Sequence, residues 1–215
     1  MKMQGTDTLK VLMLDGSRSF SALISTMLRG MGVRSLAVFD DSEAAITFLR
    51  ANPVDVILVD GALANATAFK FAMALRQDKQ QFRRTVPMIL LSGSGGTQVA
   101  RKAVESGFDA LLPKPIRAVR LYEQMLSLMR RPRVYIHARI GYCGPDRRRP
   151  AASDFSGANR RDGETFQVHT KSGPVSLDRL EKLQAKSADH PDLEVLLVRG
   201  VTILSGYKLN AALAA

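Results

Sequence analysis

The chain has 215 residues, of which 46% are hydrophobic and 24% are charged, and this composition is typical of a globular protein. No apolar run approaches the roughly 20 residues of a membrane-spanning helix, and the first residues lack the apolar core of a signal peptide. We therefore expect a cytoplasmic protein with no membrane partner. The single cysteine, Cys143, excludes an internal disulfide and is expected to be a free thiol.

The net charge is +11, and the positive excess is greatest between Arg130 and Arg161, where nine arginines face only Asp146 and Asp154. Such an excess indicates an acidic or phosphate-bearing partner for this segment. The alternative is a solvated basic linker that has no ligand.

Strand-like and helix-like runs alternate through the first 130 residues. Dense apolar runs predict strands at residues 9–14, 33–39, 54–60, 86–91 and 110–112. Apolar residues at helical spacing predict helices between Ser17 and Gly30, at 42–51, around 69–75, at 98–106 and at 117–129. Five strand–helix units predict an α/β fold with a doubly wound, five-stranded parallel sheet.

Four polar residues stand at the predicted carboxyl ends of strands, namely Asp15, Asp60, Ser92 and Lys114. In an open α/β sheet, ligands bind outside the carboxyl ends of the parallel strands. Two carboxylates, a hydroxyl and an ammonium are therefore expected to converge there. Taken singly, Asp15 is equally well a loop cap, Ser92 a strand-end hydroxyl and Lys114 a solvated lysine.

These strand ends resemble those of the response-regulator receiver domain, a CheY-like fold of the flavodoxin type, over residues 9–130. VLMLD resembles its first strand, VDVILVD the strand that bears its phospho-acceptor aspartate, VPMILLSG the strand that ends in its hydroxyl, and GFDALLPKPI its lysine–proline ending. The resemblance implies a signalling protein of a two-component phosphorelay rather than an enzyme.

The resemblance also implies a role for each residue. Asp60 is expected to be the phospho-acceptor, Lys114 to neutralise phosphoryl oxygens, and Ser92 to hydrogen-bond the phosphoryl group. Mg²⁺ is expected at Asp15 and Asp60, and a cis peptide bond is expected between Lys114 and Pro115. The implied partners are a sensor histidine kinase or phosphotransfer protein, which donates the phosphoryl group, and a downstream protein target.

Three features depart from the family pattern. Gly16 replaces the second acid of the usual acidic pair, so we expect Mg²⁺ to bind weakly. Residues 63–64 and 67–68 replace the usual Met-Pro and Asp-Gly after the acceptor, and Leu111 replaces an aromatic switch residue. The sequence therefore leaves open a degenerate receiver that is not phosphorylated and acts by binding alone.

Outside the receiver, three further segments are expected. Residues 1–8 are expected to be a flexible N-terminus, and residues 131–175 a basic, largely irregular linker with a short extended stretch near 134–140. Residues 176–215 are expected to form a small tail of two short amphipathic helices. No helix-turn-helix spacing is convincing there, so DNA is not an expected partner.

The linker contains a compact cation cluster, Arg147, Arg148 and Arg149. Arginine forks bind phosphates bidentately and stack on bases. The stretch resembles the arginine-rich tails of chemotaxis-type receivers that bind cyclic di-GMP, which makes a cyclic dinucleotide a candidate ligand. RNA, an acidic protein surface and no ligand at all are the alternatives. A phosphorylation-independent receptor for an anionic nucleotide is thus the second function that the sequence allows.

Overall fold

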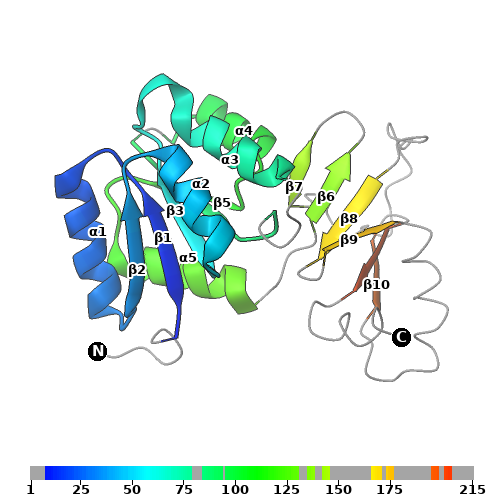
Figure 1. Cartoon of the computed structure of the whole chain (residues 1–215), viewed down its shortest axis with the longest axis horizontal. Helices are drawn as coiled ribbons and strands as arrows, with labels where there is room; N and C mark the ends of the chain where they lie inside the picture. The colour runs from blue at the N-terminus through cyan, green and yellow to red at the C-terminus, as the bar shows by residue number, and fades with distance from the viewer. Residues whose placement is uncertain are drawn as a thin grey trace. The chain divides into compact units, whose positions relative to one another are not determined.

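The computed structural model describes residues 8–78, 84–93, 95–130, 135–138 and 142–145, together with the strand residues 166–170, 173–176, 195–198 and 201–204. The chain divides into two compact units, Met1–Arg131 and Pro132–Ala215. In the first unit a central sheet lies between layers of helices (Figure 1). In the second unit every described element is a strand.

The sheet of the first unit contains five parallel strands in the order β2-β1-β3-β4-β5. The strands are β1 (Lys10–Leu14), β2 (Ser35–Phe39), β3 (Val56–Asp60), β4 (Met88–Ser92) and β5 (Ala110–Pro113). Every residue of β3 and β4 is buried, as expected for the apolar runs of a parallel sheet that is covered on both faces. The predicted doubly wound, five-stranded sheet is confirmed.

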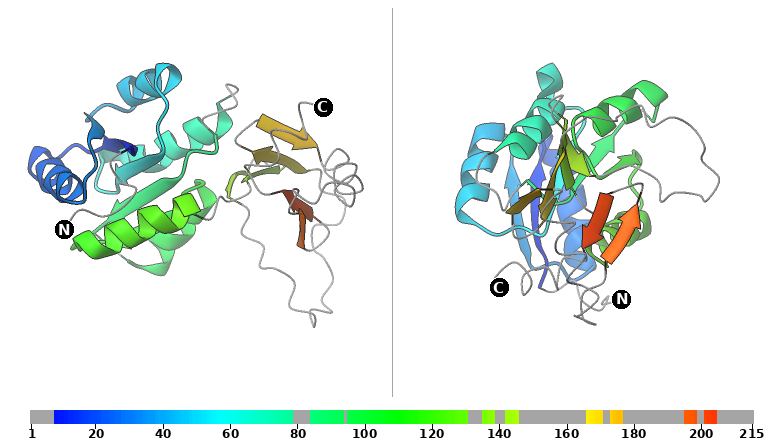
Figure 2. Two further views of the ribbon diagram at one scale, coloured as in Figure 1. Left: turned by 90° about the horizontal axis from the view of Figure 1, so that it is seen from below. Right: turned by 90° about the vertical axis from the view of Figure 1, so that its right-hand side faces the viewer.

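Helices cover both faces of this sheet (Figures 1 and 2). They are α1 (Arg18–Gly30), α2 (Ser42–Ala51), α3 (Thr67–Gln77), α4 (Thr97–Glu105) and α5 (Ala118–Arg130), with a short 3-10 turn, η1 (Ala64–Ala66), before α3. Residues of α1 and α5 pack into one hydrophobic cluster, and residues of α2, α3 and α4 pack into a second cluster on the opposite face. Among the described residues, none of the helices combines the length and apolar character needed to span a bilayer.

Side-chain oxygens cap the first turns of two helices. Ser17 caps α1, and its side chain accepts a hydrogen bond from the Phe20 N–H. The cap of α2 is Asp41 rather than Ser42, because the Asp41 carboxylate accepts from the Ala44 N–H at 2.7 Å. A carboxylate satisfies the free N–H groups of a first turn and also interacts favourably with the helix dipole.

The second unit contains an antiparallel sheet in the order β7-β6-β8-β9. Its strands are β6 (Tyr135–Ala138), β7 (Cys143–Pro145), β8 (Phe166–Thr170) and β9 (Gly173–Ser176). Within β7 and its approach, the Tyr142 hydroxyl donates to the carbonyl of Pro145 at 3.0 Å. The prediction of a largely irregular segment over 131–175 is therefore wrong where these strands lie, whereas the extended stretch near 134–140 is present as β6.

The prediction of the second of the two short helices within residues 176–215 is also wrong. Residues Val195–Val198 (β10) pair antiparallel with Val201–Leu204 (β11), and Val198 is the partner of Val201. Leucines in this stretch keep helical spacing, but its β-branched residues favour strands, and only Arg199 and Gly200 separate the paired ends. The other predicted helix, at 177–183, lies outside the described residues.

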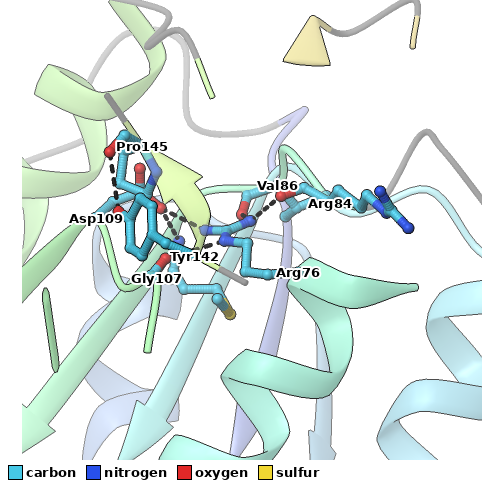
Figure 3. A network of polar contacts seen from close by, with 8 residues as sticks. Arg76, Arg84, Val86, Gly107, Asp109, Tyr142 and Pro145 are labelled. Carbon is cyan, nitrogen blue, oxygen red and sulfur yellow. Dashed lines mark hydrogen bonds and ion pairs between the residues drawn. The ribbon is translucent and has the colours of Figure 1, made fainter. Parts of the chain in front are cut away.

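A buried arginine joins three segments at the amino ends of β4 and β5 (Figure 3). Arg76, near the end of α3, is only 1% exposed. Its Nε donates to the carbonyl of Gly107 at 2.9 Å, and its Nη1 donates to the carbonyls of Val86, at 2.8 Å, and Arg84. Its Nη2 lies 2.8 Å from Oδ2 of Asp109, whose side chain is completely buried.

Removing one partner of such a pair leaves the other charge buried and uncompensated, which costs about 3–5 kcal/mol. We therefore expect Arg76→Met to lower the free energy of unfolding by about that amount, measured by urea titration. The control is Arg101→Met, which breaks the exposed Arg101–Glu105 pair and should leave the unfolding midpoint unchanged. Equal midpoints for the two variants would contradict the role given to Arg76.

Candidate functional site

The carboxyl edge of the parallel sheet brings together the four residues singled out in the sequence. Asp15 directly follows β1, Asp60 ends β3, Ser92 ends β4 and Lys114 directly follows β5. Asp15 and Asp60 are each 3% exposed and Ser92 is 5% exposed. The Lys114 N–H donates to the carbonyl of Ser92 at 2.7 Å, which fixes the start of the lysine loop against the end of β4. The peptide bond between Lys114 and Pro115 is cis, as predicted.

The centre of this site is an ion pair. Nζ of Lys114 lies 2.7 Å from Oδ1 of Asp60. The same carboxylate oxygen accepts from the Ala62 N–H at 3.1 Å. The Lys114 ammonium also lies over the ring of Phe20, 3.5 Å from the ring centroid. At the end of β3, the Asp60 carboxylate therefore contacts both an ammonium and a backbone amide, and the same ammonium contacts an aromatic face.

Gly61 lets the loop after Asp60 run close to β4. Its N–H donates to the carbonyl of Leu91 at 2.7 Å. A Cβ atom at this position would lie 3.2 Å from that carbonyl oxygen and 3.5 Å from Cα of Ser92. A larger residue would push the loop away from the strand end, so glycine keeps Asp60 and Ser92 on adjoining, tightly packed strand ends.

Asp15 is the member of the group whose hydrogen bonding to the described residues is incomplete. Its Oδ1 accepts from the Ser17 N–H at 2.9 Å, but its Oδ2 is buried and makes no hydrogen bond to the described residues. Burial raises the pKa of Asp15, the hydrogen bond from Ser17 lowers it, and the nearby Asp60 carboxylate raises it further. The net direction is upward from the usual value of 3.8.

Asp15 and Asp60 suit a magnesium ion, which proteins usually hold by one or two carboxylates while it keeps several waters. The buried Oδ2 of Asp15 supplies the oxygen lone pairs that such an ion needs. Among the described residues, no three His, Cys, Asp or Glu side chains form a metal-binding group. Gly16 is exposed, and a Cβ there would lie 3.4 Å from Cδ2 of Leu63, so a third acid is absent although there is room for one.

Sequence reasoning missed Phe20 as a site residue, because its spacing on α1 identified it only as part of an apolar helix face. Its place in the first turn after Asp15 is the signal that could have revealed it. Leu111 lies on β5 as the partner of Leu90 and packs on the hydrophobic cluster beneath. Arg147, Arg148 and Arg149 lie outside the described residues.

The raised pKa of Asp15 predicts a pH-dependent stability. The folded chain binds the Asp15 proton more tightly than the unfolded chain. The stabilisation from this proton is therefore complete below pH 3.8, and it is lost as the pH rises from 3.8 through the folded-state pKa. Asp15→Asn removes this loss, and the asparagine oxygen can still accept from Ser17. We expect the variant to be more stable than wild type at neutral pH by about 0.5–2 kcal/mol in metal-free buffer. Urea titrations should show this advantage shrinking below pH 3.8, and no advantage at neutral pH would contradict it.

The first unit of the chain is similar to known proteins. The family model of the response regulator receiver domain matches residues 11–126. Two curated relatives are the sensor histidine kinase GacS of Pseudomonas protegens, 28% identical over 119 residues, and the chemotaxis protein CheY of Pseudomonas aeruginosa, 22% identical over 123 residues. These matches cover 55% of this chain and 13% of GacS, and 57% of this chain and 98% of CheY. The chain thus spans only a small part of GacS.

A solved structure shows the same fold. The receiver domain of the sensor histidine kinase PA1611 from Pseudomonas aeruginosa, which has a magnesium ion coordinated in its active-site cleft, superposes with a TM-score of 0.52 at 20% identity. The match covers 57% of this chain and 98% of that domain. The family model spans more than half of the 215 residues. The chain therefore belongs to the response regulator receiver domain family.

Proposed function

We propose that Asp60 is the phosphoryl acceptor through which this receiver protein takes part in phosphorelay signal transduction. One observation carries the proposal, namely the 2.7 Å contact between the Lys114 ammonium and the Asp60 carboxylate at the buried carboxyl edge of the sheet. A carboxylate this buried needs a compensating cation, and the cation stands where phosphoryl oxygens would be added. The sequence of the acceptor strand and of the lysine–proline loop supports the same reading.

In the proposed reaction an oxygen of the Asp60 carboxylate attacks the phosphorus of a phosphohistidine. The new O–P bond forms while the P–N bond breaks, and the imidazole nitrogen retains the electron pair of the broken bond. Phosphoryl transfer needs positioning and cationic stabilisation more than covalent assistance. Lys114 neutralises charge on the phosphoryl oxygens, and the hydroxyl of Ser92 donates a hydrogen bond to one of them.

Magnesium is the proposed cofactor, and Asp15 and Asp60 are the residues that would hold it. When bound, Mg²⁺ neutralises negative charge on the phosphoryl group and on the two carboxylates. This role accounts for the buried Oδ2 of Asp15, which makes no hydrogen bond to the described residues and whose burial costs free energy. The proposed phosphoryl donor is a sensor histidine kinase or phosphotransfer protein, and the proposed recipient of the signal is a downstream protein.

The acceptor role predicts one phosphoryl adduct. After incubation with acetyl phosphate and Mg²⁺, intact-mass analysis should show a single added phosphoryl group on the wild-type chain and none on Asp60→Asn. Asp55→Asn is the matched control, because Asp55 lies at the opposite end of the same strand and accepts from the Lys10 N–H at 2.9 Å, as an asparagine also can. An adduct that persists in Asp60→Asn, or that is absent from the wild type, would contradict the proposal.

The missing acid predicts weak magnesium binding. Gly16→Asp adds a carboxylate beside Asp15, so calorimetry should show Mg²⁺ binding about tenfold tighter than in wild type, a gain of about 1.4 kcal/mol. The side chain fits, because a Cβ at this position meets only the end of Leu63. Gly30→Asp adds the same charge about 20 Å away at the other end of α1 and should not change the affinity. Equal affinities for all three proteins would show that Gly16 does not weaken the site.

A second candidate function, binding of an anionic nucleotide, rests on a repeat in the basic segment. GPDRR at residues 144–148 recurs as GANRR at residues 157–161. The first copy begins within β7, and its arginines follow the end of that strand at Pro145 by two residues. In a ligand with two phosphates, each phosphate would face one arginine pair, and guanidinium groups bind phosphates bidentately. Cyclic di-GMP is a ligand of this chemistry.

Nucleotide binding can be tested with charge-matched variants. We expect Arg147→Ala with Arg148→Ala, and separately Arg160→Ala with Arg161→Ala, to weaken cyclic di-GMP binding at least about tenfold in calorimetry. Arg117→Ala with Arg120→Ala removes the same charge from the surface of the receiver and should leave binding unchanged. The wild-type affinity should fall as salt is added, because exposed charges are screened over roughly 8 Å at physiological ionic strength. Wild-type protein that does not bind the nucleotide would remove this candidate.

A further inference from the structure

The Lys114 ammonium has a second neighbour besides the proposed acceptor. It lies 2.7 Å from Oδ1 of Asp60 and 3.5 Å from the centroid of the Phe20 ring. Most of the lysine side chain is covered, with 23% of it exposed. The ammonium is therefore held between a carboxylate, which changes its charge when it is phosphorylated, and an aromatic face, which does not.

The backbone of Phe20 is linked by hydrogen bonds to the loop that carries Asp15. The Ser17 N–H donates to Oδ1 of Asp15 at 2.9 Å, and Oγ of Ser17 accepts from the Phe20 N–H at 3.3 Å. The Phe20 side chain is half-buried and packs against the hydrophobic cluster between the sheet and α1. Contacts therefore run from the carboxylate of Asp15 through the first turn of α1 to the ammonium of Lys114.

An aromatic face attracts an ammonium through its quadrupole without forming a directional bond to one oxygen. An ammonium on such a face can turn from a carboxylate oxygen to a phosphoryl oxygen while it keeps its cation–π contact with the ring. A third carboxylate in the site would instead compete with the phosphoryl group for the ammonium, and Gly16 provides none. An uncharged aromatic neighbour is therefore better suited than a further carboxylate to hold the Lys114 ammonium in this site.

We propose that Phe20 is a positioning residue, which holds the Lys114 ammonium beside Asp60 and so presents it to the incoming phosphoryl group. The consequence for phosphoryl uptake rests on the acceptor role proposed above for Asp60, whereas the contact between Phe20 and Lys114 does not. A residue that only fills the core would tolerate an apolar replacement of similar volume. A residue that acts through its π face requires a ring at this position.

Three variants separate the two roles. Phe20→Leu keeps apolar bulk and removes the π face, while Phe20→Tyr keeps the ring. Leu23→Ala is the matched control, because Leu23 lies one turn further along α1 and is 50% exposed. Thermal unfolding of each variant checks that it is folded before any comparison is made.

The first measurement uses the unphosphorylated protein. Ammonium protons above an aromatic face are shifted by the ring current, so the ¹⁵N-correlated ammonium signal of Lys114 should move in Phe20→Leu. The signal should stay near its wild-type position in Phe20→Tyr and Leu23→Ala. A Lys114 signal that is the same in wild type and Phe20→Leu would overturn the proposal, whatever happens at Asp60.

The second measurement is the initial rate of phosphoryl uptake from acetyl phosphate with Mg²⁺. We expect Phe20→Leu to be about fivefold slower than wild type, which corresponds to about 1 kcal/mol, with Phe20→Tyr and Leu23→Ala within about twofold of it. A Phe20→Leu rate equal to the wild-type rate would refute the positioning role. Wild-type protein that takes up no phosphoryl group would refute the acceptor role of Asp60 instead, and the Lys114 signal then decides the Phe20 contact alone.

Discussion

The burial of the Asp60 carboxylate at the end of an apolar strand is the constraint on which the site depends. β3 is buried along its whole length, so a charge at its end needs a partner inside the protein. The partner comes from β5, two strands away in the sheet, since β4 lies between them. Lys114 therefore reaches Asp60 across the end of β4, and the strand end that carries Ser92 lies between the ends of β3 and β5.

This constraint explains why local sequence patterns were sufficient to locate the core of the site. Each of the four side chains stands at the end of an apolar run, and the carboxyl ends of parallel strands meet at one edge of the sheet. The alternation of strands and helices was enough to predict where four residues would lie, with no knowledge of distant contacts: Asp15, Asp60, Ser92 and Lys114. The two core clusters followed from the same alternation, because helices on both faces bury both sides of the sheet.

Other features could not be predicted from the sequence because they depend on contacts between distant segments. Arg76 looks like an ordinary surface residue of α3, yet its guanidinium is buried against Asp109, 33 positions along the chain. Phe20 looks like a core residue of α1, yet its ring lies under the lysine of the loop after β5. The strands at 195–198 and 201–204 were predicted as helix, because leucines in a short apolar run fit both periods.

The departures from the family pattern change how a charge at Asp60 can act on the rest of the receiver. Leu111 pairs with Leu90 and packs into the core, so no aromatic ring at this position can turn toward or away from Ser92. The aromatic ring that does touch the site belongs to Phe20, which is linked to Asp15 through Ser17. Addition of a phosphoryl group to Asp60 would alter the charge that faces Lys114, and Lys114 contacts both the end of β4 and the first turn of α1. The amino-terminal turn of α1 is thus linked to Asp60 through Lys114, as is the strand that carries Ser92.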